Sequence, residues 1–178
     1  MKPIVKTPNE ILTTPAKNVV KIDGRVLSVI GDLKDTLIQA DNPKGVGLAA
    51  PQIGLALRIF LIRPAETDSI RVFINPQFSA KSKTLVKGLP DNKLEGCLSV
   101  PKVWGVVTRH TWIKLSYLNE AGETQTEKFT GFAAIIIQHE MDHLDGILFT
   151  WRVLEQKGQL YKPGIDENGK EILEPLEI

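Results

Sequence analysis

The segment 131–144 constrains this chain more than any other, because it combines an apolar run with two regularly spaced histidines. Five apolar residues, 133–137, precede the sequence Gln138-His139-Glu140-Met141-Asp142-His143. At 3.6 residues per turn, His139 and His143 fall on one face of a helix, where two imidazoles can reach one metal ion. Glu140 lies beside them, placed to contact a water rather than the ion. The sequence therefore predicts a buried helix that carries a metal site.

This pattern is typical of metal-dependent hydrolases. A metal ion lowers the pKa of a bound water towards about 7, and the glutamate accepts its proton. The alternative is an exposed amphipathic helix that carries two histidines by chance, against which the apolar run before His139 argues. His110, the third histidine, falls between strand-like runs and is interpreted as an ordinary residue at a sheet edge.

A catalytic metal site needs a third protein ligand and an open position for water. Cys97, the only cysteine, offers a thiolate beside Gly96 and a Ser-Val-Pro turn. Its alternative role is that of a small buried hydrophobe. Glu155 is the first glutamate downstream of His143 and would be the third ligand in a metalloprotease that cleaves internal peptide bonds. We favour Cys97.

The periodicity predicts a second helix over residues 24–41, since Val26, Ile30, Leu33 and Leu37 share one face. Asn42-Pro43 ends that helix. Between the two helices, short β-branched and aromatic runs predict strands at 57–62, 70–75, 103–108, 111–118 and 124–129. From residue 147 onwards we expect strands or irregular coil. Two helices with several antiparallel strands indicate an α+β fold.

Composition narrows the class of protein. The 178 residues are expected to form one domain, 1–178, and 22 basic against 21 acidic residues leave a net charge of +1. That balance argues against a protein that binds nucleic acid or acidic membranes. One cysteine excludes an internal disulfide, no apolar run reaches 18 residues, and the first residues lack the apolar stretch of a signal peptide. We therefore expect a soluble cytoplasmic protein.

The stretch Gly45-Val46-Gly47-Leu48-Ala49-Ala50 formally matches the dinucleotide fingerprint G-x-G-x-x-G/A. That fingerprint follows a strand and opens a helix, whereas here a helix precedes it and Pro51 interrupts the chain directly after it. We interpret the stretch as a loop whose small residues let a substrate backbone approach, with the Gln52 amide as a hydrogen-bond donor. A tight structural turn is the alternative.

Three stretches together resemble peptide deformylase, a family that carries three such motifs in this order. They are Gly45-Val46-Gly47-Leu48-Ala49-Ala50-Pro51-Gln52, then Glu95-Gly96-Cys97-Leu98-Ser99, then Gln138-His139-Glu140-Met141-Asp142-His143-Leu144-Asp145-Gly146. The resemblance covers roughly residues 3–153. It implies an enzyme that removes the N-formyl group from the N-terminal methionine of newly made polypeptides and releases formate. It also implies an α+β fold in which antiparallel sheets pack around a central metal-binding helix.

Carried over position by position, the resemblance implies that Cys97, His139 and His143 hold the metal. Ferrous iron is the usual ion of the family, and zinc, nickel and cobalt are the alternatives. Glu140 is expected to act as general base and then acid, while the Gln52 amide and the Leu98 backbone N–H stabilise the oxyanion.

The resemblance also implies how substrates and partners bind. Val46, Phe132, Ile135 and Ile136 are candidates for an apolar pocket that takes the methionine side chain, and Gly47 is expected to pair with the substrate backbone. The expected partners are N-formylmethionyl nascent peptides, with a transient association with the ribosome. No specific nucleic acid and no membrane are expected, and the chain is expected to be a monomer in a bacterial-type cytoplasm.

Three details depart from the family or extend the resemblance. Several members carry an arginine seven residues after the cysteine, where this chain has Trp104, so the preference beyond the first substrate residue stays open. Charge complementarity and family analogy predict an ion pair between Arg109 and Asp142 behind the helix. Gly158, Pro163-Gly164 and Gly169 favour a strand-and-turn ending.

A catalytically inactive module that binds peptide N-termini is a further alternative for the function of this chain. The presence of Glu140 argues against it.

Overall fold

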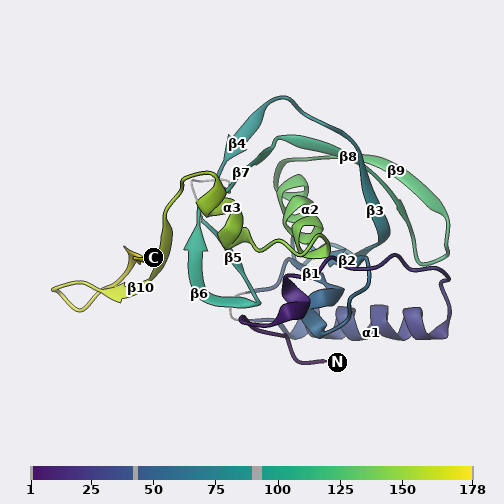
Figure 1. Cartoon of the computed structure of the whole chain (residues 1–178), viewed down its shortest axis with the longest axis horizontal. Coiled ribbons are helices and arrows are strands. Elements are labelled where there is room, and N and C mark those ends of the chain that lie inside the picture. The colour runs from purple at the N-terminus through teal and green to yellow at the C-terminus, as the bar shows by residue number, and fades with distance from the viewer. Residues whose placement is uncertain (1, 42–43, 90–93, 178) are drawn as a thin grey trace.

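The computed structural model describes residues 2–41, 44–89 and 94–177 (Figure 1). Its helical elements are η1 (Glu10–Leu12), α1 (Gly24–Gln39), η2 (Ala50–Ile53), α2 (Gly131–Leu144) and α3 (Phe149–Glu155). Its strands are β1 (Gly47–Ala49), β2 (Ile59–Ile62), β3 (Arg71–Lys81), β4 (Leu85–Lys87), β5 (Glu95–Cys97), β6 (Val100–Gly105), β7 (Thr108–His110), β8 (Trp112–Leu118), β9 (Thr124–Thr130), β10 (Leu160–Ile165) and β11 (Glu171–Pro175). All strand pairs between these elements are antiparallel.

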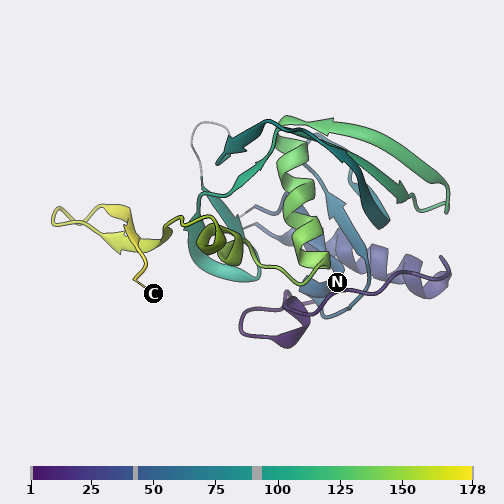
Figure 2. The same cartoon turned by 45° about the horizontal axis from the view of Figure 1, so that its top comes forward.

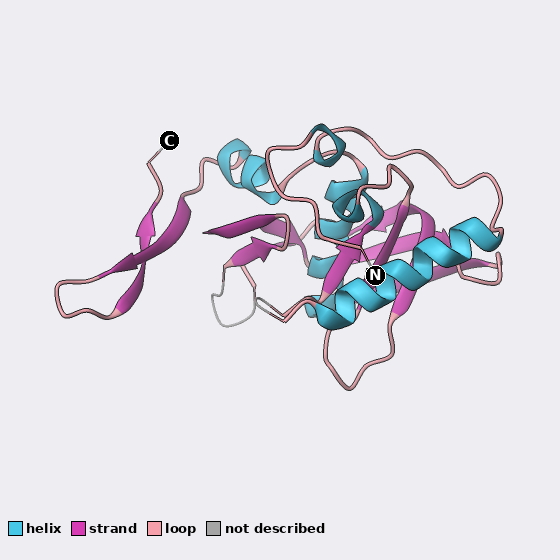
Figure 3. Cartoon of the chain, turned by 90° about the horizontal axis from the view of Figure 1, so that it is seen from below, coloured by secondary structure: helices cyan, strands magenta, loops and turns pink. Residues whose placement is uncertain are grey.

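A five-stranded sheet, in the order β1-β2-β3-β8-β9, separates the two long helices. The residues of strand β2 show why both faces of this sheet are covered by helices. Ile59 and Leu61 pack into the cluster that includes the apolar face of α1, while Phe60 and Ile62 pack into the cluster that includes α2. Because successive side chains of a strand point to opposite faces, a strand between two helices is apolar at every position. Figure 3 shows α1 lying across one side of these strands.

Helix α2 stands at the centre of the molecule, with strands around it (Figures 1 and 2). It packs against β1, β2 and β9 through residues such as Ile137, Met141 and Leu144. The chain leaves the helix through Gly146, whose φ of 72° favours glycine. A Cβ there would also lie 2.8 Å from the Thr13 backbone, so this turn fixes the N-terminal segment against the end of α2.

A four-stranded sheet, β11-β10-β6-β5, lies beside α2 and carries Cys97 at the end of β5. The short helix α3 covers it, since Phe149 and Val153 form one cluster with Cys97, Val107 and Leu160. A separate two-stranded sheet consists of β4 and β7. The hairpin β10–β11 projects away from the body of the molecule (Figure 1).

The predicted α+β fold, with antiparallel sheets around the central helix and a second N-terminal helix, is confirmed. Helix α1 ends at Gln39, two residues before the predicted end, and Asn42 and Pro43 lie outside the described residues. The predicted strand 103–108 was wrong in its bounds, because β6 ends at Gly105 and β7 begins at Thr108. The tail is partly helical, since α3 occupies Phe149–Glu155, but the strand-and-turn ending is present as β10–β11.

Among the described residues, none of the helices has both the length and the apolar character needed to cross a membrane.

Candidate active site

Three potential metal-ligating side chains meet where β5 passes α2. The ligand atoms of Cys97, His139 and His143 all lie within 4.8 Å of one another. The Cys97 Sγ is 3.2 Å from Nε2 of His143. Helix α2 supplies both imidazoles from successive turns, and β5 brings the thiol from the neighbouring sheet. A thiolate with two imidazoles is a donor set suited to zinc or iron, and three protein ligands leave one position open.

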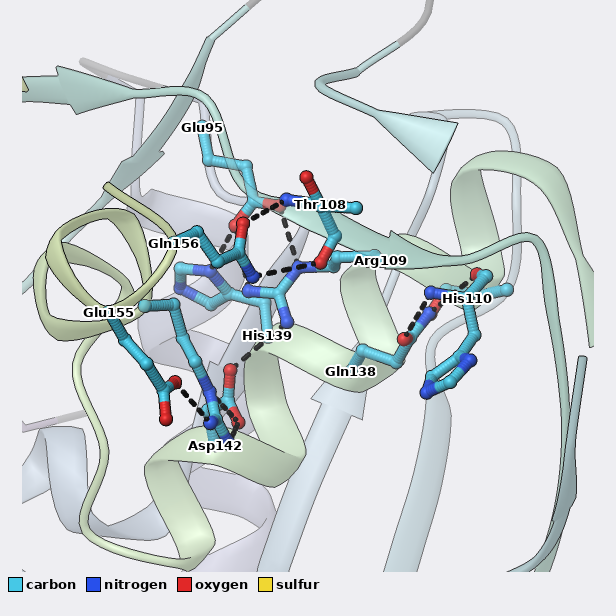
Figure 4. A network of polar contacts seen from close by, with 11 residues as sticks. Glu95, Thr108, Arg109, His110, Gln138, His139, Asp142, Glu155 and Gln156 are labelled. Atoms are coloured by element: carbon cyan, nitrogen blue, oxygen red, sulfur yellow. Dashed lines mark hydrogen bonds and ion pairs between the residues drawn. The ribbon is translucent and has the colours of Figure 1, made fainter. Parts of the chain in front are cut away.

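Buried charges hold one of these imidazoles in place (Figure 4). His139 Nδ1 lies 3.1 Å from the Glu95 carboxylate, so its Nε2 is the nitrogen left for a metal. Arg109 in turn donates to Glu95 with Nε at 2.6 Å and Nη2 at 2.8 Å, and to Asp142 with Nη1 at 3.0 Å. A carboxylate behind a ligating histidine is a common feature of metal sites, because it fixes the tautomer and the ring orientation. His143 Nδ1, by contrast, has no hydrogen-bond partner among the described residues.

The predicted ion pair between Arg109 and Asp142 is therefore present, but sequence reasoning missed the role of Glu95. A signal was available, because Glu95 and Cys97 are two residues apart and a strand places both on one face. Burial would raise the pKa of the Glu95 carboxyl, but the charge of Arg109 outweighs it and lowers that pKa to about 2. Glu95 is thus an anion, the form that a carboxylate behind a metal-ligating histidine takes.

The thiol of Cys97 favours its ionised form. Burial alone would raise its pKa, but His143 and His139 outweigh that effect and hold the pKa well below the usual value. Two further donors face the sulfur, since the Ser99 backbone N–H lies 3.4 Å away and Gln52 Nε2 3.5 Å away. A thiolate is the form of cysteine that binds metals.

Glu140 lies beside the three ligands with one oxygen unused. Its Oε2 is buried and has no hydrogen-bond partner among the described residues. Burial raises the pKa of this carboxyl to about 7, although the imidazoles of His139 and His143 oppose the shift. A carboxyl that titrates near neutral pH can both accept and return a proton. Buried polar atoms without a partner are rare, so the free oxygen marks a place for a water or a substrate atom.

Gly47 provides the space that Glu140 occupies. A Cβ at residue 47 would lie 2.3 Å from Glu140 Oε1 and 2.9 Å from a methyl carbon of Ile136. The segment around it is an edge strand, β1, rather than the loop that the sequence suggested. Helix α1 precedes it and no helix of dinucleotide-binding length comes directly after it, so the glycine pattern is not a nucleotide fingerprint.

The amide of Gln52 has a fixed orientation. Its Oε1 accepts a hydrogen bond from the Ala49 N–H at 2.8 Å, so its Nε2 must point the other way, towards Cys97 and Ser99. Leu98 lies in the adjacent turn, and its carbonyl oxygen accepts a hydrogen bond from the Lys6 ammonium. The N-terminal segment ties the two elements together, because Val5 N–H bonds to the Gln52 carbonyl and Thr7 N–H to that of Ser99.

A cavity of about 270 Å³ opens onto the metal-ligand cluster. All the residues predicted to bind substrate line it, together with Gln52, Leu98 and Glu140: they are Val46, Gly47, Phe132, Ile135 and Ile136. Trp104 also lines this cavity, packed across Gly96. Glu155 lies elsewhere, with a half-exposed side chain that pairs with Arg152 at 3.0 Å, and is not part of the cluster. His110 ends β7 at a sheet edge, as expected.

Comparison with known proteins agrees with this arrangement. A family model described as Polypeptide deformylase matches residues 1–159. The chain belongs to the polypeptide deformylase family. Peptide deformylase 1 of Bacillus subtilis is 38% identical over 153 residues, which cover 86% of this chain and 90% of that protein.

Solved deformylases share the fold. The peptide deformylase of Synechococcus elongatus in complex with actinonin has a TM-score of 0.76 and 36% identity, covering 85% of this chain and 78% of that one. A class I type b peptide deformylase of Acinetobacter baumannii with Met-Ala-Ser bound has a TM-score of 0.75 and 32% identity, covering 85% and 98%. The chain is accordingly a metal-dependent hydrolase that removes the N-formyl group from nascent polypeptides.

Proposed function

We propose that Cys97, His139 and His143 hold a single divalent ion, ferrous iron, for the deformylase reaction. The observation that carries this proposal is the convergence of the three ligand atoms within 4.8 Å, beside a buried carboxylate oxygen that has no partner among the described residues. When bound, the ion acts as a Lewis acid on the formyl oxygen and lowers the pKa of water. Zinc, nickel and cobalt suit the same donor set.

Glu140 is the proton carrier of this proposal. Its free Oε2 accepts a proton from the attacking water, and the same oxygen then delivers that proton to the departing amine, which is otherwise a poor leaving group. The raised pKa, about 7, suits both steps. Gln52 Nε2 and the Leu98 N–H donate to the formyl oxygen as negative charge develops on it.

The cavity positions the substrate. Val46, Phe132, Ile135 and Ile136 form its apolar side and take the methionine side chain, while the backbone at Gly47, on the edge strand β1, pairs with the substrate backbone. The Met-Ala-Ser bound to the Acinetobacter relative is the deformylated form of such a substrate, which supports this class of peptide. Preorganised contacts of this kind align the formyl carbon with Glu140.

The decisive experiment measures formate release from formyl-Met-Ala-Ser by anaerobically purified protein whose metal content is assayed on the same sample. We expect turnover of the formylated peptide and no cleavage of its acetylated counterpart or of internal bonds. A fully metallated sample that releases no formate would contradict the proposal.

The ligand set has its own test. We expect Cys97→Ala to lose its metal, because the thiolate is one of three ligands, whereas Glu155→Ala keeps full occupancy. Metal retention by Cys97→Ala together with loss from Glu155→Ala would instead favour the metalloprotease alternative.

We further propose that the chain works as a single-domain monomer in the cytoplasm, in transient contact with ribosomes. The substrate supports this setting, since formylated N-termini emerge from ribosomes. Light scattering and co-sedimentation with translating ribosomes test these two points.

A further inference from the structure

Within the described residues, the strand β7 pairs with another strand, β4, along one edge only. The backbone N–H and C=O of Arg109 face β4, where Arg109 pairs with Val86. In an extended strand, the N–H and C=O of one residue point to the same edge, and those of its neighbours point to the opposite edge. Thr108 and His110 therefore present four backbone hydrogen-bonding groups to the side occupied by α2 and α3.

Two glutamine side chains bind all four of these groups (Figure 4). Gln156, which comes directly after α3, accepts from the Thr108 N–H at 2.7 Å and donates to the Thr108 carbonyl at 3.1 Å. Gln138, in α2, accepts from the His110 N–H at 2.9 Å and donates to the His110 carbonyl at 2.9 Å. A primary amide carries the same donor and acceptor as a peptide group, so each glutamine replaces one residue of a missing strand.

Arg109 lies between Thr108 and His110, the two residues whose backbone groups the glutamines bind. Its side chain is buried and binds Glu95 with both oxygens of that carboxylate engaged, and Glu95 also contacts His139. A bidentate pair of this kind depends on a defined position of the guanidinium. Any shift of the β7 backbone at Thr108 or His110 would therefore move Arg109 and, through Glu95, the imidazole of His139.

We propose that Gln138 and Gln156 are positioning residues of the metal site, which act through β7, Arg109 and Glu95 on His139. This inference rests on the proposed role of His139 as a ligand. Gln138 is the residue before His139 on α2, so its own removal would disturb the helix as well. Gln156 is exposed and follows α3 rather than lying in α2, which makes it the informative position.

The test compares Gln156→Ala with Gln159→Ala. Gln159 is also exposed, and its amide also binds backbone carbonyls, but those of Leu160 and Leu176 at the base of the hairpin. Three experiments are made on each metal-loaded variant: the rate of metal loss to a chelator, steady-state kinetics with a formylated peptide for kcat and KM, and hydrogen exchange of the Thr108 amide.

We expect Gln156→Ala to lose metal about three- to tenfold faster, less than the 10–100-fold typical when a direct partner of a ligand is removed. The value of kcat should fall while KM stays unchanged, and the Thr108 amide should exchange faster while that of His110 stays protected. Gln159→Ala should match the parent in all three. Equal metal loss from Gln156→Ala and the parent would overturn the proposal.

A double-mutant cycle tests whether the effect passes through Glu95. In a Glu95→Gln background the link from Arg109 to His139 is weakened, so adding Gln156→Ala should accelerate metal loss no further. Full additivity of the two effects would overturn the proposed route. The variant His139→Ala separates this result from the ligand assignment. If His139→Ala keeps its metal, the proposed function is wrong. If His139→Ala loses its metal while Gln156→Ala behaves like the parent, only the proposed positioning role of the two glutamines is refuted.

Discussion

Glu140 and Gly47 share one small space beside the three ligand atoms. The Glu140 carboxylate reaches its position only because residue 47 has no side chain, and both residues line the cavity. The proposed chemistry of the site therefore depends on two residues that are 93 positions apart in the sequence. Each can be changed without removing a ligand, so their effects on activity and on metal content can be separated.

We expect Glu140→Gln to lower formate release by about 10²–10⁴-fold, the usual contribution of a positioned acid or base. The amide keeps the shape of the side chain but cannot carry the proton. Metal content should stay that of the parent, because the three ligands remain. Glu155→Gln, an exposed change outside the cavity, serves as the control and should leave the rate unaltered.

Gly47→Ala should reduce kcat by about 10²-fold, the scale of a displacement of roughly 1 Å at a reacting group. The new methyl would overlap Glu140 Oε1, so the carboxylate must move, and overpacking should cost about 1–3 kcal/mol of stability. Gly31→Ala is the matched control, because a Cβ at this site in α1 meets nothing within 4 Å. That variant should gain about 0.5–1 kcal/mol and keep its activity. An active Gly47→Ala enzyme would show that the carboxylate tolerates the displacement.

At the scale of elements, α2 was predictable because two signals agreed there, an apolar run and paired histidines. Helix α3 was not, since seven residues are too few for periodicity to stand out, although Phe149 and Val153 are one turn apart. The strands β1 and β5 are three residues long and contain glycine, which hid them. The motifs therefore identified the candidate ligands, whereas Glu95 could be placed behind His139 only once β5 was recognised as a strand.

The ion pairs between β5, β7 and α2 give a prediction about stability. Arg109→Met removes the partner of two buried carboxylates, Glu95 and Asp142, and should lower the free energy of unfolding by about 3–5 kcal/mol. Arg152→Met should cost less, because Arg152 is partly exposed and Asp142 would keep Arg109. Urea denaturation of both variants measures the difference, and equal losses would contradict this account.

At the scale of the whole molecule, the hairpin β10–β11 supplies no residue of the cavity lining. The hairpin joins the body through Leu160 and Tyr161, which pair with Gly105 and Trp104 of β6. Leu176 adds a contact with the cluster around Phe149. The family model matches residues 1–159, so this hairpin lies beyond the part of the chain that the model describes.

A chain that ends at Tyr161 should therefore keep kcat and KM for a formylated peptide. Its free energy of unfolding should fall by less than about 3 kcal/mol, the upper end for burying one leucine, since Leu176 is lost while Leu160 stays. Kinetics and urea denaturation of the truncated and full chains test this. A large loss of kcat would show that the hairpin supports the cavity.

The turn at the tip of this hairpin is also a suitable attachment site. The Asp166 side chain accepts hydrogen bonds from the Asn168 and Lys170 N–H groups, so the turn is closed by its own residues. Insertions are tolerated best at exposed turns of this kind. An affinity tag or a fluorophore placed between Glu167 and Gly169 would tether the enzyme to a surface with its cavity still open to peptides in solution.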